Sequence, residues 1–336
     1  MSENTGRPGP LNWSAFVKEA LRRRKAEGLT QREHAALAGV SVPTIAAFDR
    51  GERTLTLTKA FDILQVVGLI EEPDEANAQT AFVQESIARW RQLVDALPPD
   101  SPARFPHGHY RVDYHLDGEL REVSLTEFEG ILRQAEQPHT GWPAFIFLTR
   151  PESKPREIDG GMECWLSPSP DKSDRLFRDA AHSDFWRAML PGRLALMRGY
   201  EEDGQDTFPP GTIFDTTLPV WRLGEVLLHA EKLASLMRAR NAPSPTVRFR
   251  AVYSGLTGRI LRPWANPMSD LAFEGRAARS DEATLELAVP AETITDRLAD
   301  YLFPMIASLF ERFGVAGLSP SRVEAEARRL LSNRVC

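Results

Sequence analysis

The chain has 336 residues, of which 42% are hydrophobic and 26% charged, an ordinary balance for a globular protein that excludes wholesale disorder. Its formal net charge of −6 is unevenly spread: residues 1–70 hold 10 Lys/Arg against 7 Asp/Glu, and residues 71–336 hold 31 against 40. The first stretch has the positive charge that phosphate binding needs, whereas the acidic remainder argues against a protein that coats nucleic acid along its whole length.

Residues 13–27 are predicted to form a helix, because apolar side chains recur there at helical spacing. A second helix is predicted to begin at about Gln31, where Thr30 and Glu33 have the spacing of a capping box that satisfies free amides at a helix start. Gly39 ends this helix, because a residue without a Cβ takes a left-handed backbone conformation easily.

A third helix is predicted after this turn. Ser41 is its N-cap, Pro43 occupies its first turn, where a missing N–H costs nothing, and Gly51 ends it. Residues 57–67 repeat the amphipathic pattern and predict a fourth helix. The two short central helices cannot stand alone, so all four are expected to pack into one all-helical domain over residues 1–70.

This stretch resembles the Cro/repressor-type (XRE) helix-turn-helix proteins over about residues 12–70. The positions that match the family pattern are Leu29, Thr30, Gln31, Ala35, Gly39, Val40, Ser41, Thr44, Ile45, Arg50 and Gly51. The resemblance implies an ion pair between Asp49, where the family usually has Glu, and Arg24. His34 departs from the family, because it stands where a leucine is usual on the inner face of the first motif helix.

The resemblance implies that the segment from Ser41 to Arg50 is a recognition helix that enters the major groove of DNA. Gln31, Arg50 and Arg53 would contact phosphates. Four side chains would face base edges: Val42, Pro43, Thr44 and Ala47. Three of these four have no hydrogen-bonding side chain, so we expect modest direct readout and a larger contribution from phosphates and DNA deformability. The alternative is a helical domain that binds protein or has lost DNA binding.

Residues 71–106 are predicted to connect two domains. An acidic boundary at residues 71–75 precedes a helix at residues 76–97, and a proline-rich linker runs from there to Pro106. Apolar side chains form a heptad seam along the helix: Val83, Ile87, Trp90, Val94 and Leu97. Two heptads are marginal alone, so the seam either forms a homodimer, as is usual for this motif class, or docks on the same chain.

Residues 107–336 are predicted to form an α+β domain with a mixed or antiparallel sheet, because strands and helices do not alternate strictly. Strands are expected at residues 110–116, 120–123, 144–148, 161–166, 194–198, 247–253, 259–261 and 284–289. Helices are expected after Ser124 and at residues 220–240, 291–313 and 320–332. Asp117 and Gly118 predict a hairpin turn between the first two strands.

Four stretches of this region resemble the uncharacterised module that follows AlbA-like DNA-binding domains in some bacterial proteins. They lie at residues 140–143, 184–203, 218–233 and 255–259. The resemblance implies no activity. It implies a sensing or interaction module that is combined with different DNA-binding heads.

The sequence contains no phosphate loop, no dinucleotide fingerprint, no nucleophile elbow and no zinc-protease motif, so we expect no catalytic residue and no cofactor. The best metal candidate is the set His107, His109, Asp113 and His115, which share one face of an extended strand. Residues 107–115 would span roughly 25 Å in a strand, too far for one ion. A surface strand with ordinary histidines is therefore expected, and no metal site.

Tryptophans and arginines are the best ligand-binding candidates in this region. Six residues are predicted to bind a ligand: Trp142, Trp186, Arg187, Arg198, Trp221 and Arg222. Aromatic faces beside guanidinium groups suit a flat or anionic ligand, including nucleotides. In the alternative, the tryptophans fill a large core and the arginines pair with nearby acidic residues, Glu201, Glu202, Asp203 and Glu225.

These patterns together predict a sequence-specific, DNA-binding transcriptional regulator, a homodimeric repressor on a pseudo-palindromic operator in double-stranded DNA. Its C-terminal domain would respond to a small molecule, a nucleotide or a protein. The 2 cysteines, Cys164 and Cys336, show no disulfide or zinc pattern, and no apolar run approaches about 18 residues, so a cytoplasmic location without a membrane partner is expected. Two other functions remain open: a DNA-targeted enzyme or nucleic-acid-processing module, and an antitoxin-like interaction adaptor.

Overall fold

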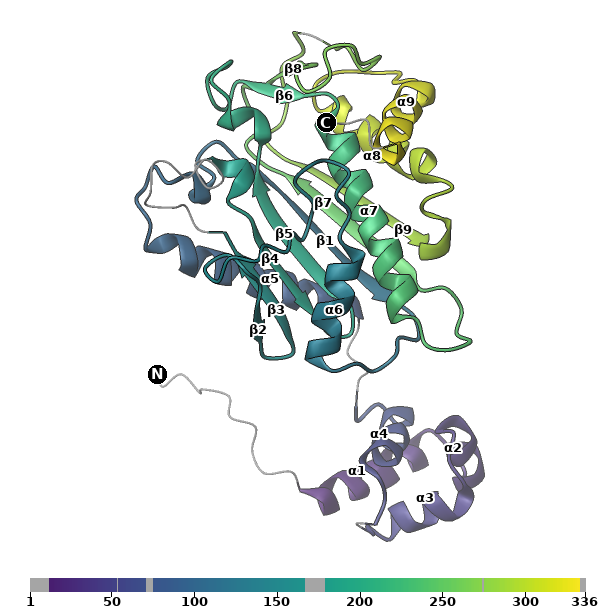
Figure 1. Ribbon diagram of the computed structural model, residues 1–336. Coiled ribbons are helices and arrows are strands. Elements are labelled where there is room, and N and C mark those ends of the chain that lie inside the picture. Colours follow the sequence, from purple (N-terminus) through teal and green to yellow (C-terminus); the bar gives the residue numbers. More distant parts are fainter. Residues whose placement is uncertain (1–11, 53, 71–74, 167–178, 274, 333–336) are drawn as a thin grey trace. The chain divides into compact units, whose positions relative to one another are not determined.

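The computed structural model describes residues 12–52, 54–70, 75–166, 179–273 and 275–332, whose helices and strands are drawn in Figure 1. The chain divides into two compact units, residues 1–78 and residues 79–336. The boundary falls inside one helix, α5 (Glu75–Asp95). The predicted acidic boundary, apart from Glu75, and Cys336 lie outside the described residues.

The N-terminal unit is helical. Its described residues form α1 (Trp13–Ala26), α2 (Gln31–Leu37), α3 (Val42–Asp49) and α4 (Leu57–Val66), followed by the first turn of α5. One apolar core joins the four helices, with buried Val17, Ala20, Ala35, Ala38, Ile45, Phe48, Ile63, Leu64 and Val67. The predicted all-helical domain is confirmed, and the start of α2 falls at the predicted residue.

Side chains at the predicted caps set the helix ends in this unit. The Thr30 hydroxyl accepts the Glu33 amide hydrogen at 3.2 Å, and the Glu33 carboxylate accepts the Thr30 amide hydrogen at 2.8 Å, which completes the capping box. The Ser41 hydroxyl accepts the Thr44 amide hydrogen at 3.3 Å. Gly39, with φ of +61°, takes the left-handed conformation between α2 and α3.

His34 is accommodated in the core by a hydrogen bond. Its side chain is 1% exposed, and its Nε2 lies 2.9 Å from the carbonyl oxygen of Ile63. Because a carbonyl oxygen can only accept, Nε2 carries the hydrogen. Ile63 lies in the last turn of α4, where carbonyl groups lack helical partners. His34 therefore replaces an apolar contact with a cap on α4.

The C-terminal unit is built on a seven-stranded antiparallel sheet with the strand order β2-β3-β4-β5-β1-β7-β9. The strands are β1 (His109–Asp117), β2 (Arg156–Ile158), β3 (Gly161–Trp165), β4 (Phe185–Met189), β5 (Arg193–Gly199), β7 (Thr246–Tyr253) and β9 (Ala283–Pro290). A second, parallel pair joins β6 (Ile213–Asp215) to β8 (Ile260–Arg262). The predicted α+β class is confirmed, and of the two predicted sheet types the main sheet is the antiparallel one.

Helices cover both faces of this sheet (Figure 1). On one face lie α6 (Leu125–Ala135) and α7 (Leu218–Met237), and α8 (Leu298–Glu311) and α9 (Pro320–Leu331) pack against α7. Nearly every residue of α7 is buried, so this helix is the centre of the unit. Short 3-10 helices complete it: η1 (Pro102–Arg104), η3 (Ala180–His182), η4 (Glu201–Gly204) and η5 (Ala291–Thr293).

The heptad seam of α5 packs on the other face of the same chain's sheet. Val83 is 3% exposed and packs in a cluster with Ala195 of β5, whereas Trp90 stacks on Phe105 with ring centroids 5.4 Å apart. Val94 is also buried, and Ile87 packs both against the cluster of Val83 and Ala195 and against a second cluster that contains Phe105. Part of the seam thus docks on its own chain, which is one of the two predicted alternatives.

The predicted proline-rich linker is part of the second unit. The Arg104 guanidinium donates to the carbonyl oxygens of Asp95, Leu97 and Pro98 at distances of 2.8 to 3.1 Å. Carbonyls at the end of a helix need such donors, so Arg104 caps α5. Residues 79–106 therefore pack with the domain that follows them, where the sequence had predicted a separate connecting segment.

Two predicted strands are wrong. Residues 120–123 do not return beside β1, because both edges of β1 are already paired, one with β5 and one with β7. Residues 144–147 are buried and Leu148 is half-buried, but the segment is irregular, and Phe145 has φ of +53°. The strand β4 was not predicted, because Phe185 and Trp186 are both buried, on opposite faces, and so do not alternate with polar residues.

Candidate functional site

The helix α3 has one buried face and one exposed face. Ile45 and Phe48 are at most 1% exposed, whereas Ser41, Val42 and Pro43 lie on the surface at its start, with Val42 42% exposed. Two other predicted base-edge residues, Thr44 and Ala47, are half-buried. The Thr44 hydroxyl is within 2.8 Å of the Ser41 hydroxyl, so the first turn of α3 already uses part of its hydrogen-bonding capacity.

A buried ion pair holds α3 against α1. The Arg24 guanidinium donates two hydrogen bonds to the Asp49 carboxylate, at 2.9 and 2.7 Å, and the two side chains are 9% and 13% exposed. Bidentate pairs of this kind fix orientation as well as contributing energy. The pair implied by the family resemblance is therefore present, and it sets the angle at which α3 presents its outer face.

The side chains predicted to contact phosphates differ in the partners that they already have. The Gln31 side-chain amide donates to Asp49 at 2.6 Å, which leaves its second hydrogen for a phosphate. Arg50 pairs with Glu52 at 2.8 Å, and their side chains are 63% and 41% exposed, so water screens this pair and a phosphate can replace Glu52. Arg53 lies outside the described residues.

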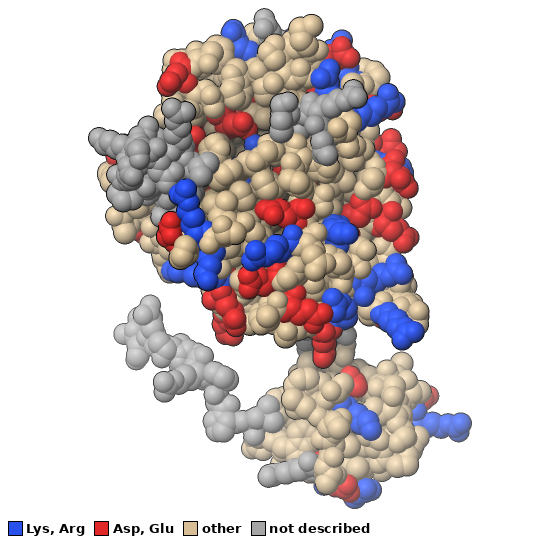
Figure 2. All heavy atoms as spheres, viewed as in Figure 1, with Lys and Arg blue, Asp and Glu red and all other residues tan. Residues whose placement is uncertain are grey.

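Both signs of charge are interspersed on the face of the C-terminal unit shown in Figure 2. A surface that tracks the DNA backbone needs a continuous run of cations. On this face no such run spans the described residues of the unit, in agreement with the acidic balance of residues 71–336.

Four of the six predicted ligand-binding residues converge at the start of α7. The carbonyl oxygen of Trp142 accepts hydrogen bonds from Arg198 at 3.3 Å and from Arg222 at 2.8 Å. Arg222 also donates to the Glu201 carboxylate at 2.6 Å, and Trp221 is its neighbour in α7. The guanidinium groups therefore share one backbone acceptor, although each has its own carboxylate.

The other two predicted residues lie elsewhere. Trp186 is fully buried in the main core, where its ring contacts Phe145 and Phe147. Arg187 follows it in β4 and therefore points to the opposite face, where its Nε lies 3.7 Å from the Glu163 carboxylate. The core-packing alternative thus describes Trp186, and the ion-pair alternative describes Arg187.

Arg198 and Arg222 stay charged despite burial. Burial by itself lowers the pKa of the Arg198 guanidinium, but the adjoining Asp184 carboxylate, hydrogen-bonded to it, holds the pKa above its ordinary value. Burial likewise opposes ionisation of Arg222, and Glu201 raises its pKa. Each cation is thus stabilised by an acidic partner, one buried and one partly exposed.

The three acidic residues of η4 point to three different partners. Glu201 pairs with Arg222, Asp203 pairs with Arg259, and Glu202 accepts the Asp215 amide hydrogen at 3.0 Å. Burial, together with the nearby Asp215 charge, raises the pKa of Glu202 to about 8. A carboxyl group with this pKa keeps its proton at neutral pH.

Asp215 anchors the start of α7. Its Oδ1 accepts the amide hydrogens of Thr217 and Leu218, both at 2.7 Å, and the Thr217 hydroxyl. Its Oδ2 accepts the amide hydrogens of Trp264 and Ala265, both at 2.7 Å. Both oxygens are used for structure, so Glu202 and Asp215 do not form a free acid–base pair. Sequence reasoning missed Asp215, although an Asp shortly before Leu-Pro is a helix-start signal.

The predicted metal candidates have other partners. Asp113 pairs with Arg111 and Arg250, and the His109 ring stacks on Phe105. Burial lowers the pKa of His109 to about 4. Over the described residues, no group of three or more His, Cys, Asp or Glu side chains is arranged to hold a metal ion.

Comparison with known proteins identifies the N-terminal unit. Residues 21–72 match the helix-turn-helix family, so this unit is an XRE-type helix-turn-helix domain. No curated protein matches the chain. The resemblance of the four stretches at residues 140–143, 184–203, 218–233 and 255–259 to the module behind AlbA-like domains therefore has no support from these comparisons. No helix in the described parts of the chain combines the length and the apolar composition that crossing a lipid bilayer requires.

Proposed function

We propose that the protein is a sequence-specific, dimeric transcriptional repressor in the cytoplasm, and that its C-terminal unit adjusts DNA affinity in response to a ligand or partner. The observation that carries the proposal is the outer face of α3, held by the buried Arg24–Asp49 pair in a unit that matches the helix-turn-helix family. A fixed α3 is what insertion into a major groove requires. Repression needs occupancy of a promoter and no contact with polymerase.

The chemistry of α3 supports two half-sites for each operator. The exposed Val42 and Pro43 offer contacts to thymine methyl groups and no hydrogen bonds to bases. One unit therefore discriminates weakly, and two units at a fixed spacing multiply the discrimination. For the dimer contact we propose α4, where Leu57 and Phe61 lie one turn apart and are 69% and 45% exposed.

We propose that the helix α5 couples ligand binding in the C-terminal unit to DNA binding by the N-terminal unit. Its first turn belongs to the N-terminal unit, and the rest packs on the sheet of the C-terminal unit. A ligand that binds two arrangements of the C-terminal unit unequally would change the population of the arrangement that binds DNA.

The test is binding of the full-length chain to the DNA upstream of its own gene, measured by fluorescence anisotropy at several salt concentrations. We expect specific binding with a Kd that rises steeply with salt. The double variant Thr44→Ala, Arg50→Ala should weaken binding roughly 10- to 100-fold through a lost base-edge contact and a lost phosphate contact.

The matched control is Arg328→Ala, because Arg328 is an exposed, ion-paired arginine in α9. It should leave DNA affinity unchanged. Absence of specific binding at low salt, or equal affinity of the double variant and the control, would contradict the proposal.

A further inference from the structure

Two adjoining cavities lie at the start of α7. The outer cleft, of about 280 Å³, is lined by Thr140, Glu201, Leu218, Trp221, Arg222, Trp264 and Ala265. The inner chamber has a volume of about 20 Å³, room for about one water molecule. Glu201, Leu218 and Arg222 line both, so the Glu201–Arg222 ion pair stands where the cleft meets the chamber.

The inner chamber presents hydrogen-bond donors without acceptors. Tyr110 and Tyr253 line it and are 5% and 2% exposed. The Tyr253 hydroxyl has no hydrogen-bond partner among the described residues. The Tyr110 hydroxyl oxygen faces the Arg198 guanidinium, which can only donate, so the Tyr110 hydroxyl hydrogen still lacks an acceptor. The neighbouring Tyr200 differs, because its hydroxyl donates toward the carbonyl oxygens of His109 and Ser254, at 3.1 and 2.8 Å. Buried hydroxyl hydrogens normally have an acceptor, so these two suit an acceptor that enters from outside.

The ion pair between cleft and chamber is asymmetric. The Arg222 side chain is 9% exposed and is held by Thr140 and by the Trp142 carbonyl, whereas the Glu201 side chain is 32% exposed. Glu201 is therefore the partner that can move. A carboxylate from solution can take its place on Arg222 without adding a charge to the interior, because one anion replaces another.

Two tryptophans, Trp221 and Trp264, line the outer cleft. The Trp221 indole donates to Glu326 at 3.0 Å, and the Trp264 amide donates to Asp215 at 2.7 Å. The first bond holds the Trp221 indole ring itself, and the second holds the backbone of Trp264. Two indole rings beside a guanidinium favour a flat, apolar group that carries an anion. A cleft of this volume is at the lower end of ligand sites and admits about one ring.

We propose that this cleft is a binding site for a small aromatic carboxylate, whose anionic group displaces Glu201 from Arg222 and points toward the Tyr110 and Tyr253 hydroxyls, while its ring lies against Trp221 and Trp264. The assignment of this ligand as the effector rests on the proposed repressor function. The binding site itself does not depend on DNA binding.

Benzoate is the probe. Benzyl alcohol, which lacks the charge, and acetate, which lacks the ring, are the controls. Isothermal titration calorimetry and tryptophan fluorescence of the full-length chain should show saturable binding of benzoate. Both controls should bind at least 10-fold more weakly. Benzoate that binds no more tightly than either control, or does not bind at all, would overturn the proposal.

Glu201→Gln is the informative variant, because it removes the competing carboxylate from a partly exposed position. We expect benzoate to bind roughly 3- to 10-fold more tightly to it. Tyr253→Phe, which removes one unpaired hydroxyl and no existing bond, should weaken binding roughly 3-fold. Unchanged or weaker binding by Glu201→Gln would refute the displacement of Glu201.

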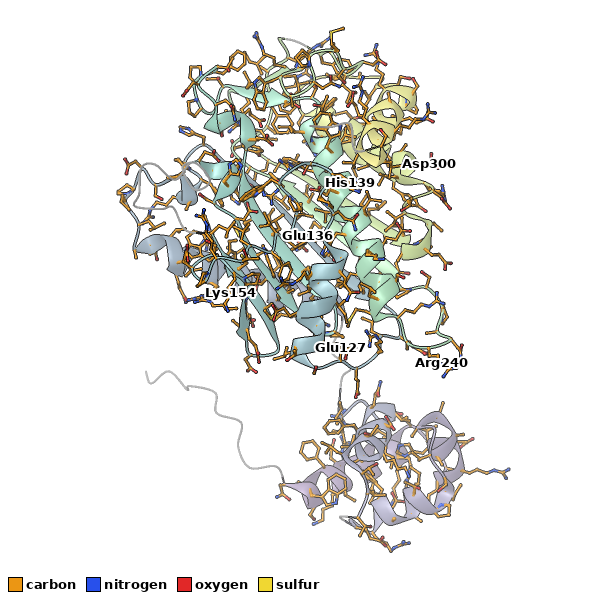
Figure 3. All side chains as sticks on the ribbon, in the orientation of Figure 1. Glu127, Glu136, His139, Lys154, Arg240 and Asp300 are labelled. Atoms are coloured by element: carbon orange, nitrogen blue, oxygen red, sulfur yellow. The ribbon has the colours of Figure 1, made fainter. Side chains whose placement is uncertain are left out.

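The matched control is Glu127→Gln. Glu127 is also a partly exposed, ion-paired carboxylate, bound to Arg121, and Figure 3 shows it at the lower end of α6, away from β6. Its variant should bind benzoate as the parent chain does. An affinity gain equal to that of Glu201→Gln would reduce the effect to a general change in surface charge and overturn the proposal.

Repeating the DNA titration with saturating benzoate separates the two proposals. If DNA binding is specific but benzoate does not bind, the cleft proposal fails and the regulator proposal stands. If benzoate binds with the expected variant pattern and no specific DNA binding occurs, the regulator proposal fails and the cleft stands.

Discussion

The two units of this chain are stabilised by polar groups in different ways. In the N-terminal unit, Arg24 and His34 are the buried polar side chains among the described residues, and its caps join residues three positions apart. The C-terminal unit buries many charges, and partners such as Arg259 and His107 are 152 positions apart. Short-range polar signals make a unit recognisable from sequence, whereas long-range ones hold together an interior that sequence does not reveal.

Removing a buried carboxylate should therefore cost more in the C-terminal unit. Asp184→Ala leaves the Arg198 guanidinium, in a residue 1% exposed, without its anion, and we expect the free energy of unfolding to fall by about 3–5 kcal/mol. Asp49→Ala likewise leaves Arg24 without its anion, but Arg24 lies nearer the surface than Arg198 does. We expect the free energy of unfolding of the N-terminal unit to fall by about 2 kcal/mol. Urea unfolding measures the first, and hydrogen exchange over residues 13–66 measures the second.

The control for both is Asp300→Ala. Asp300, labelled in Figure 3, forms an exposed i,i+3 pair with Arg297 on the surface of α8. Its removal should leave unfolding unchanged within error, because water screens such pairs. Equal losses at Asp184 and Asp49 would remove the contrast between the two units.

The protonated Glu202 should make the stability of the C-terminal unit depend on pH. Burial raises its pKa from 4.5 to about 8 in the folded state, so between these values the folded state binds the proton more tightly. The resulting stability is present in full below pH 4.5 and is lost as the pH rises through 8. Relative to Glu202→Gln, the parent chain should lose on the order of 5 kcal/mol across this window, because each pH unit between the two pKa values contributes about 1.4 kcal/mol.

Urea unfolding of both proteins at several pH values measures this difference. The pH-dependent loss should vanish in the variant, which has no proton to release at this position. A difference between the two proteins that stays constant, or that grows as the pH falls, would show that Glu202 is ionised in the folded state.

The smallest expected effect distinguishes the tyrosines around the inner chamber. Tyr200→Phe leaves two carbonyl oxygens without the hydroxyl that they share and should cost about 1–2 kcal/mol. Tyr253→Phe breaks no hydrogen bond within the described residues and should cost about 0 kcal/mol. Thermal unfolding of the two variants checks this pair. A larger loss for Tyr253→Phe would mean that its hydroxyl is already satisfied.

Local patterns allowed much of the fold to be predicted. The caps at Thr30 and Ser41 fixed the starts of α2 and α3, and the alternation from Tyr110 to Leu116 identified β1. Residues 144–148 were assigned to a strand because an apolar run has the same composition in a strand and in a buried irregular segment. Periodicity cannot separate these when all sides are buried.

The site was partly predictable for a similar reason. Arginines beside tryptophans drew attention to Arg198 and Arg222, which the structure brings together. Trp186 and Arg187 were grouped as neighbours in sequence, but they lie in a strand that was not recognised, and adjacent strand residues point to opposite faces. The facing of Tyr110 and Tyr253 depends on the register of β1 with β7, and no local signal carries that register.

The strand order has a consequence for synthesis of the chain. β1 is an interior strand made early, and its neighbours are β5 on one side and β7 on the other. A nascent chain that has passed Gly199 can pair one edge of β1, while the other edge waits until residues 246–253 leave the ribosome. During that interval β1 presents unpaired backbone groups, the kind of edge that chaperones shield and that invites aggregation. A nonsense codon before residue 246 would therefore release a chain without β7 and β9, in which β1, an interior strand of the complete sheet, is left as an unpaired edge.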